Sequence, residues 1–566
     1  MHQKKLKIYF YSPCRTLSRP VDKFYEKDQS LFINPTPLYL DSYIKANYPE
    51  LTERIEWTKL QYLPLSQQDL VNEIDLFDID VVAFSVYTWN EIELYKNIKG
   101  IDKLTKKPVK FIIGGPSVNI VRDPEYLLNL PEIEFAIYAQ GEVPFVSIVK
   151  HYLDIEKISL LKTKNVAWIK DGVVKKADYE FTRITRGSPI IESRYLLEQI
   201  KNDPSLKNRT LNFPYETSRG CPYACTFCDW SSGLSHKVSK RKYVYEDELD
   251  TLGQLGFTDL YMADANFGLF PEDLGIAETM ARLKKEKGYQ FLIYGSNFSK
   301  TKKDIVFKIA DIFVGAGITP YLKLSIQDIN EEVLKNINRP DIAWDKHTEY
   351  IAALRKKYPG TIIALDIIKG LPGQTRQTWE KMFEEICIHD ILIDTNDWEM
   401  IANSPAGYDK EYAERMQLKT MYRYSVSGEF GRYKEEIVGT FSYDQRDYAY
   451  FTLIDMVYNK FFRNYSRAFP EFIKLIKTSS YMESALDEIL LTFTDTTTFA
   501  KIIDKFMVNL LKENIHILNP SFVKIAVKKI HLGTRADGGH IVKITHNSTE
   551  EALAAAFQNP VKFMVP

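Results

Sequence analysis

Hydrophobic and polar positions follow two rhythms over the first 155 residues. Short runs rich in β-branched and aromatic residues are separated by longer stretches with helical spacing. Strands that alternate with helices are typical of a parallel sheet covered on both faces, so we expect a doubly wound α/β domain over residues 1–155. The expected strands occupy residues 7–11, 55–62, 80–86, 109–113 and 135–139.

A second alternating region begins after a charged stretch that contains proline. Residues 156–205 fit a linker with a β-hairpin over residues 166–176, turning at Asp171-Gly172. Six further strand-like runs with helical stretches between them then predict a partial (β/α)6 barrel over residues 206–420, with its site at the carboxyl ends of the strands. The expected strands occupy residues 213–217, 260–263, 291–294, 321–324, 362–368 and 397–401.

The last part of the chain, residues 421–566, has a different pattern. It is rich in aromatic residues and helical spacing, as in residues 443–462 and 499–512, and predicts a mainly helical C-terminal domain. The charged run 524–546 suggests a small β addition. No motif in this region indicates a chemistry.

Composition narrows the class of protein and its partners. The chain is 45% hydrophobic and 26% charged, which is enough for several packed cores. Its 74 Lys and Arg residues nearly balance 75 Asp and Glu residues, so no overall field attracts nucleic acid. No signal-peptide pattern and no run of about 18 apolar residues is found, so we expect no membrane association. The few, clustered cysteines favour a reducing compartment, and we expect the cytoplasm.

Three of the five cysteines stand together directly after the first expected barrel strand. Cys221, Cys225 and Cys228 have the spacing C-x3-C-x2-C. Such a loop supplies three thiolates to one cuboidal iron-sulfur cluster and leaves the fourth iron open to a small molecule. The alternative is a zinc knuckle, for which His236, eight residues further on, is the nearest fourth ligand.

Three expected strands of the first region end in small or polar loops, which begin at Ser85, Gly114 and Gln140. Ligands of doubly wound sheets lie outside the carboxyl ends of the strands, where glycine lets the backbone approach a bulky cofactor. Ordinary turn chemistry explains each single loop equally well.

The cysteine loop resembles that of the radical S-adenosylmethionine (SAM) superfamily, whose hallmark is C-x3-C-x2-C. Further similarity lies in Asp264-Ala-Asn-Phe-Gly268, Gly370-Leu-Pro-Gly-Gln-Thr375 and Asn403-Ser-Pro405, which follow the second, fifth and sixth expected barrel strands. Together with the N-terminal sheet domain, residues 1–420 are similar to the cobalamin-binding (class B) radical SAM enzymes, most of all to C-methyltransferases of peptides or natural products.

The resemblance implies a set of polar residues around SAM. Asp264 and Asn266 correspond to positions near the SAM amino group or the substrate, and Ser296, Ser325 and Gln327 to positions near its ribose and carboxylate. Each of them could instead satisfy local backbone groups. The residues implied to contact SAM or line its site are Phe227, Asp264, Asn266, Ser296, Ser325, Gln327, Gly370, Gly373 and Asn403.

The resemblance also implies that cobalamin lies over the N-terminal sheet. One departure is the absence of D-x-H-x-x-G, the motif with which many proteins supply a histidine ligand to cobalt, so histidine ligation is in doubt. A sheet domain that keeps the fold without the corrin is the alternative. The residues implied to contact cobalamin are Ser85, Gly114, Gly115, Gly141 and Glu142.

The function implied by the resemblance is methyl transfer to an unactivated carbon. A [4Fe-4S] cluster would cleave SAM to a 5′-deoxyadenosyl radical, the radical would remove hydrogen from a peptide or small-molecule substrate, and methylcobalamin would supply the methyl group. One SAM would act as oxidant and another as methyl source, with a reductant such as flavodoxin or ferredoxin. The alternatives are a radical SAM enzyme that catalyses epimerisation, cyclisation or rearrangement, and a noncatalytic zinc-binding scaffold.

Overall fold

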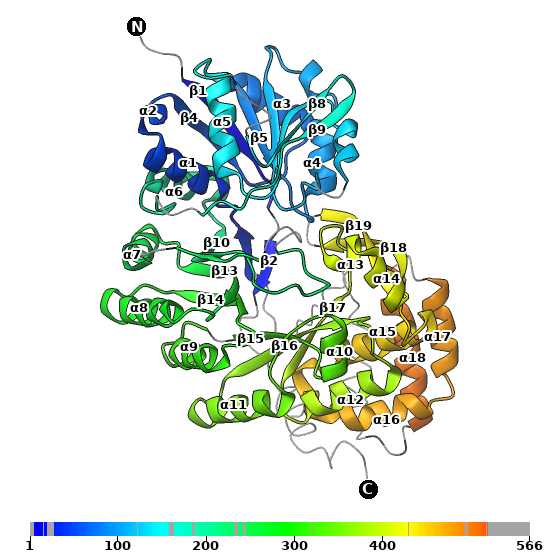
Figure 1. The fold of residues 1–566 in the computed structure, drawn as a ribbon. Helices are drawn as coiled ribbons and strands as arrows, with labels where there is room; N and C mark the ends of the chain where they lie inside the picture. The colour runs from blue at the N-terminus through cyan, green and yellow to red at the C-terminus, as the bar shows by residue number, and fades with distance from the viewer. Residues whose placement is uncertain are drawn as a thin grey trace.

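The protein consists of a sheet domain, a curled half-barrel and a bundle of helices (Figure 1). The structure is a computed structural model, and the three-part α/β architecture expected from the sequence is confirmed. It describes residues 5–14, 16–19, 28–120, 123–157, 163–183, 187–230, 236–241, 245–319, 321–427, 430–492, 496–514, 516 and 518.

The N-terminal sheet has the strand order β4-β1-β5-β6-β7-β8-β9, and its first five members are parallel. Alternate residues of β1 face opposite helix layers: Ile8 and Phe10 pack in the core with α1 and α5, whereas Tyr9 and Tyr11 pack in the core with α3 and α4. These elements are β1 (Leu6–Tyr11), β4 (Ile55–Gln61), β5 (Val81–Ser85), β6 (Lys110–Gly114), β7 (Ile133–Ile137), α1 (Thr36–Asn47), α3 (Gln67–Leu76), α4 (Glu91–Ile98) and α5 (Glu142–Tyr152).

The expected hairpin belongs to this sheet. It forms β8 (Val166–Lys170) and β9 (Val173–Lys176), and β8 pairs antiparallel with β7. The sheet therefore continues into the stretch expected as a linker, and α6 (Arg194–Asn202) follows it.

Two strands that lie between β1 and α1 in the sequence belong to the barrel sheet and not to the N-terminal sheet. These are β2 (Thr16–Arg19) and β3 (Asp28–Phe32), and β3 runs parallel to the first barrel strand with Leu31 opposite Leu211. The pairing of β3 with the barrel sheet was not predicted, because β3 is short and half polar. The two α/β parts are therefore interleaved.

The half-barrel contains the six expected parallel strands, hydrogen-bonded as β10-β13-β14 and β15-β16-β17, with β14 beside β15. Helices α7 (Tyr245–Leu255), α8, α9, α11 and α12 cover its outside (Figure 1). The bounds of the remaining elements are β10 (Thr210–Tyr215), β13 (Asp259–Phe267), β14 (Leu292–Phe298), β15 (Tyr321–Gln327), β16 (Ile362–Lys369), β17 (Leu392–Asp397), α8 (Glu272–Lys287), α9 (Lys303–Gly315), α11 (Trp344–Lys357) and α12 (Arg376–Cys387).

The sixth strand was expected at residues 397–401, and this position is wrong because the strand lies earlier in the chain. The strand is β17, which ends where the expected one begins. Its Asp394 carboxylate faces Lys323 of β15, so a polar side chain occupies a position where an apolar one would have marked the strand.

The C-terminal region begins with a hairpin that the sequence analysis missed, β18 (Lys419–Ser427) and β19 (Phe430–Gly439). The expected helical character of the rest is confirmed for the described residues, whereas the run 524–546, expected as a β addition, lies outside them. None of the described helices is long and apolar enough to cross a bilayer. The helices are α15 (Gln445–Val457), α16 (Phe469–Thr478), α17 (Met482–Leu491) and α18 (Thr496–Asn514).

Candidate active site

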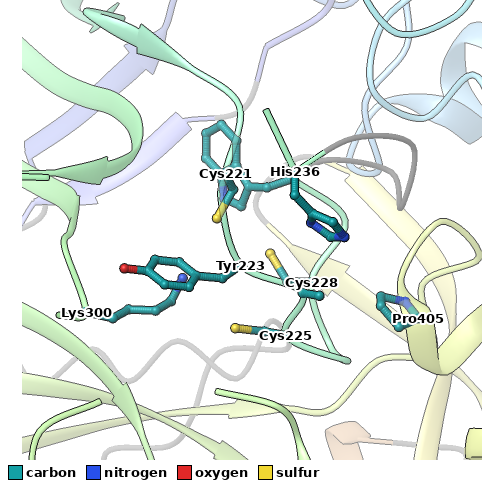
Figure 2. A pocket seen from close by; sticks show the side chains of 9 residues that line it. Cys221, Tyr223, Cys225, Cys228, His236, Lys300 and Pro405 are labelled. Atoms are coloured by element: carbon teal, nitrogen blue, oxygen red, sulfur yellow. The ribbon is translucent and has the colours of Figure 1, made fainter. Parts of the chain in front are cut away.

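The three clustered cysteines line one open pocket of about 310 Å³ (Figure 2). Cys221 and Cys225 are buried and Cys228 is half-buried. Burial raises the pKa of the Cys228 thiol to about 12, and a metal that binds this sulfur has to displace its proton. The remaining lining residues are Tyr223, Ala224, Trp230, His236, Lys300 and Pro405.

The three thiols can be compared with the demands of a single metal ion and of a cluster. Among the residues that the structure describes, no three His, Cys, Asp or Glu side chains form a group that could hold one metal ion. A cuboidal cluster makes a different demand, because each thiolate binds a separate iron at its own corner. Three thiols that line one pocket fit this demand, and their role as cluster ligands stays a prediction.

The tip of the cysteine loop is tied to the far side of the barrel. The Thr226 N–H donates to the Ile337 carbonyl (3.0 Å), and the Thr226 carbonyl accepts from the Ala406 N–H (2.8 Å). The Thr226 hydroxyl also bonds the Tyr412 hydroxyl at 2.9 Å. Phe227 packs against an apolar cluster that includes Ile337 and Leu371. The loop is thus held by segments that follow β15, β16 and β17.

The base of the cysteine loop is held by Asp264, which is fully buried. Its carboxylate accepts from the Thr217 N–H and hydroxyl (2.6 and 2.5 Å) and from the Ser218 N–H and hydroxyl (both 2.9 Å). Burial raises the pKa of Asp264, while Lys240, the Thr217 hydroxyl and the N–H groups of Thr217 and Ser218 oppose the shift. The observed contacts give Asp264 a loop-holding role, and its contact with SAM stays a prediction.

A polar chain runs from one cysteine to a buried lysine. The Asn266 amide donates to the Cys221 sulfur (3.1 Å), and the Lys300 ammonium donates to the Asn266 oxygen (3.4 Å). Lys300 also lies 4.7 Å from the centre of the Tyr223 ring. Asn266 was predicted from the sequence as a SAM-site residue, whereas Lys300 and Tyr223 were not. Lys300 directly follows β14, at the same sheet edge as the cysteines, and that position was the available signal.

Charged and polar side chains line the inner face of the second half of the barrel. The Ser325 hydroxyl donates to Asp366 (3.0 Å), and the Lys323 ammonium bridges Asp366 (2.7 Å) and Asp394 (3.2 Å). Burial alone would lower the pKa of Lys323, but the two carboxylates outweigh it and raise the pKa. Ser325 was named from the sequence, whereas Lys323 and both aspartates were missed because they lie within strands.

Gln327 ends β15 in a left-handed conformation, with φ of +70°. Ser296 lies in β14 at the corresponding edge, and its side chain is outside the described set. Asn403 is buried in the turn before Pro405, which lines the cysteine pocket. These residues surround the same end of the barrel, and their contacts with SAM stay predictions.

The glycine loop after β16 is held by Gln374. The Gln374 side-chain oxygen accepts from the N–H groups of Gly370 and Leu371 (2.8 and 2.9 Å), and its amide donates to Asp328 (2.7 Å). Burial raises the pKa of Asp328 to about 6. Gly370 and Gly373 both have positive φ, and Cβ atoms there would lie 2.9 Å from neighbouring side chains. The loop is a tight turn, and its role beside adenine stays a prediction.

The predicted cobalamin-contacting residues lie at the carboxyl edge of the N-terminal sheet, but two of them are already engaged. The Ser85 hydroxyl accepts from the Asn34 amide (2.9 Å) in a buried network. Glu142 is buried and forms an ion pair with Arg219 (2.6 Å). Gly115 has φ of +111°, and a Cβ there would lie 2.4 Å from the Val86 carbonyl oxygen. Contacts of Ser85, Gly114, Gly115, Gly141 and Glu142 with a corrin stay predictions.

The carboxyl edge of the N-terminal sheet faces the base of the cysteine loop. Arg219, two residues before Cys221, reaches Glu142 at the start of α5. On the other side, the Phe32 ring makes edge contacts with Trp89, which follows β5, and with Tyr261 of β13, each at 6.1 Å. The two places where α/β proteins bind their ligands therefore confront each other across one junction.

Comparison with known proteins places this geometry in context. Residues 215–386 match the family model of the Radical SAM superfamily. Cobalamin-dependent radical SAM methyltransferase TokK of Streptomyces tokunonensis is 29% identical over 346 residues, which cover 59% of this chain and 48% of TokK. The 2-(S-pantetheinyl)-carbapenam-3-carboxylate methyltransferase of Streptantibioticus cattleyicolor is 29% identical over 317 residues, 53% of this chain and 44% of that enzyme. The chain thus spans about half the length of these relatives.

Solved structures share the fold over a larger part of the chain. The cobalamin-dependent SAM radical enzyme OxsB, with aqua-cobalamin and SAM bound, aligns with a TM-score of 0.60 and 12% identity, covering 100% of this chain and 84% of OxsB. The radical SAM methyltransferase TsrM from Kitasatospora setae, with cobalamin and a [4Fe-4S] cluster bound, aligns with a TM-score of 0.55 and 14% identity, covering 74% and 77%. At these identities the match concerns the fold.

Proposed function

We propose that the chain is a cobalamin-dependent radical SAM methyltransferase, because residues 215–386 match the Radical SAM superfamily model and the chain shares the fold of OxsB and TsrM. Its substrate is a peptide or small natural product that is methylated at an unactivated carbon. The curated relatives TokK and the carbapenam enzyme are both named methyltransferases, and this favours methyl transfer over epimerisation, cyclisation or rearrangement.

One observation carries the proposal. The base of the cysteine loop and the carboxyl edge of the N-terminal sheet meet at the Glu142–Arg219 ion pair, and the three thiols of that loop line one pocket. A substrate between them would be reached from the cluster side and from the corrin side, which hydrogen removal and methyl delivery require in succession. A noncatalytic zinc-binding scaffold does not require two ligand-binding edges that face each other.

The residues that would hold the cofactors differ in kind on the two sides. Cys221, Cys225 and Cys228 would hold the cluster, and Lys300 would offer an ammonium group to a carboxylate in the same pocket. When bound, a reduced cluster and SAM supply the 5′-deoxyadenosyl radical, and methylcobalamin supplies the methyl group. The corrin would rest on the backbone of the loops after β5, β6 and β7.

The chain's own residues orient and shield this site. Asp264 fixes the base of the cysteine loop, and the backbone of Thr226 fixes its tip. Phe227 and its apolar neighbours close the loop on the side of β16, which limits the access of water to a reactive centre. We further propose a single-electron donor such as flavodoxin or ferredoxin, and the cytoplasm as location, because the five cysteines form no disulfide.

The test is an anaerobic assay of the full chain with SAM, hydroxocobalamin and dithionite. We expect about four iron and about four sulfide ions per chain after reconstitution, one bound corrin, and formation of both 5′-deoxyadenosine and S-adenosylhomocysteine. Formation of 5′-deoxyadenosine alone, with a substrate consumed and no S-adenosylhomocysteine, would contradict methyl transfer. Absence of iron after reconstitution would contradict the radical SAM proposal as a whole.

A further inference from the structure

Arg219 lies where the N-terminal sheet domain and the half-barrel meet. It belongs to β11 (Ser218–Arg219), which pairs with β12 (Ser239–Lys240), and it is two residues from Cys221. Its guanidinium binds Glu142 through Nη1 (2.6 Å) and Glu216 through Nη2 (2.8 Å) and Nε (3.2 Å). Two carboxylates on different domains thus share one guanidinium, which has the planar fork for two such partners.

The surroundings of the pair keep it out of bulk water. The Glu142 side chain is 5% exposed and that of Arg219 is 25% exposed. The Tyr39 ring of α1 lies 5.3 Å from the guanidinium carbon. Removing the Glu142 charge leaves the guanidinium with Glu216 alone, so the ion pair between the two domains is lost.

The backbone on both sides of Arg219 is closely packed or hydrogen-bonded. Gly220 has φ of +93°, and a Cβ there would lie 2.2 Å from the Lys237 carbonyl oxygen. Asp264 holds Thr217 and Ser218 on the preceding side. Arg219 thus connects Glu142 of the N-terminal domain to a segment that Asp264 holds in the barrel.

We propose that the Glu142–Arg219 ion pair is the positioning contact that sets the cysteine loop against the carboxyl edge of the N-terminal sheet. Asp264 and the Thr226 backbone fix the loop to the barrel, and Glu142 fixes it to the other domain. Glu142 and Arg219 are positioning residues, since they act through the loop. The consequence for cofactor spacing rests on the proposed function, whereas the contact itself does not.

The first experiment needs no cofactor. Hydrogen exchange of the full chain is compared for Glu142→Gln, Arg219→Lys and Glu198→Gln, the last removing an exposed i,i+4 pair with Arg194. In Glu142→Gln we expect at least about tenfold faster exchange at residues 216–225 and at the start of α5. Arg219→Lys keeps the charge but loses the fork, so its effect is intermediate, and Glu198→Gln matches the parent. Equal exchange in the parent and Glu142→Gln would overturn the proposal.

The second experiment reads the spacing of the loaded protein. We measure the magnetic interaction between cob(II)alamin and the reduced cluster by electron paramagnetic resonance in the same variants. Glu142→Gln is expected to retain both cofactors and to show a magnetic interaction that is weaker or more widely distributed in strength. It should also form less S-adenosylhomocysteine for each 5′-deoxyadenosine. An unchanged interaction in Glu142→Gln would overturn the positioning role. A parent protein that binds no corrin would contradict the proposed function, and hydrogen exchange would still decide the contact.

Discussion

The two sheet edges that face each other offer their ligands different kinds of surface. At the barrel edge, Cys225, Lys300 and their neighbours present side chains to an open pocket. At the N-terminal edge, Ser85 and Glu142 are already bound to protein groups. The cluster site is thus built from side chains, whereas a corrin site here would be built from backbone and shape. Side-chain sites are sensitive to single ligand replacements, and backbone sites are sensitive to changes in loop conformation.

The largest effect is expected at a cluster ligand. In Cys225→Ala only two thiolates remain, so the cluster is poorly held and SAM cleavage falls by more than about 100-fold. The matched control is Cys387→Ala, which changes a buried cysteine at the C-terminal end of α12 and should retain iron and activity. Iron content and 5′-deoxyadenosine formation measure both. Equal loss in the two variants would remove the ligand assignment.

Next in size is the support of the cysteine loop. Asp264→Asn replaces one accepting oxygen by an NH₂ group among four donors, so buried donors lose their partner at about 2–4 kcal/mol. We expect a lower thermal midpoint and loss of iron. Asp171→Asn, at the exposed turn of β8 and β9, is the control and should change neither. A variant that keeps full iron content would show that Asp264 is dispensable to the loop.

The backbone side of the comparison is tested by two glycines with positive φ. Gly115→Ala places a Cβ 2.4 Å from the Val86 carbonyl oxygen, whereas Gly172→Ala meets nothing within 4 Å. We expect Gly172→Ala to cost about 1 kcal/mol and Gly115→Ala to cost more and to lower corrin binding while iron content is retained. Thermal denaturation and the corrin absorbance distinguish them. Equal corrin binding in both variants would argue against a backbone cradle.

The smallest effect is electrostatic. Lys300→Met removes a buried positive charge from the cysteine pocket, so reduction of the cluster becomes harder and its midpoint potential falls on the order of tens of millivolts. Lys300→Arg should preserve most of the potential, and Lys302→Met, at an exposed position, should leave it unchanged. Potentiometric titration monitored by electron paramagnetic resonance measures the shift. If the cluster in Lys300→Met has the same midpoint potential as in the parent, the Lys300 charge does not affect that potential.

The sequence predicted the features whose pattern is local. The cysteine spacing and the alternation of strands and helices were sufficient to predict the pocket and the confirmed fold class. The place of β3 in the barrel sheet depends on pairing with a strand some 180 residues later, which no local pattern records. Lys323, Asp366 and Asp394 were missed because they occupy inner strand positions, where their charges satisfy one another. Glu142 was named from the sequence, but its ion pair with Arg219 of another domain was not predicted.

The pairing of β3 with β10 limits the order in which the two α/β parts can fold during synthesis. β3 is synthesised before its partner β10, and the interval between Phe32 and Thr210 takes roughly 10 to 35 s at ribosomal speed. During that time the side of β3 that will pair with β10 is left open. A fragment starting at residue 206 would have the converse defect, since the rim of its half-barrel would lack a neighbour. Neither half can therefore be treated as a self-sufficient module that evolution or an engineer could transplant alone.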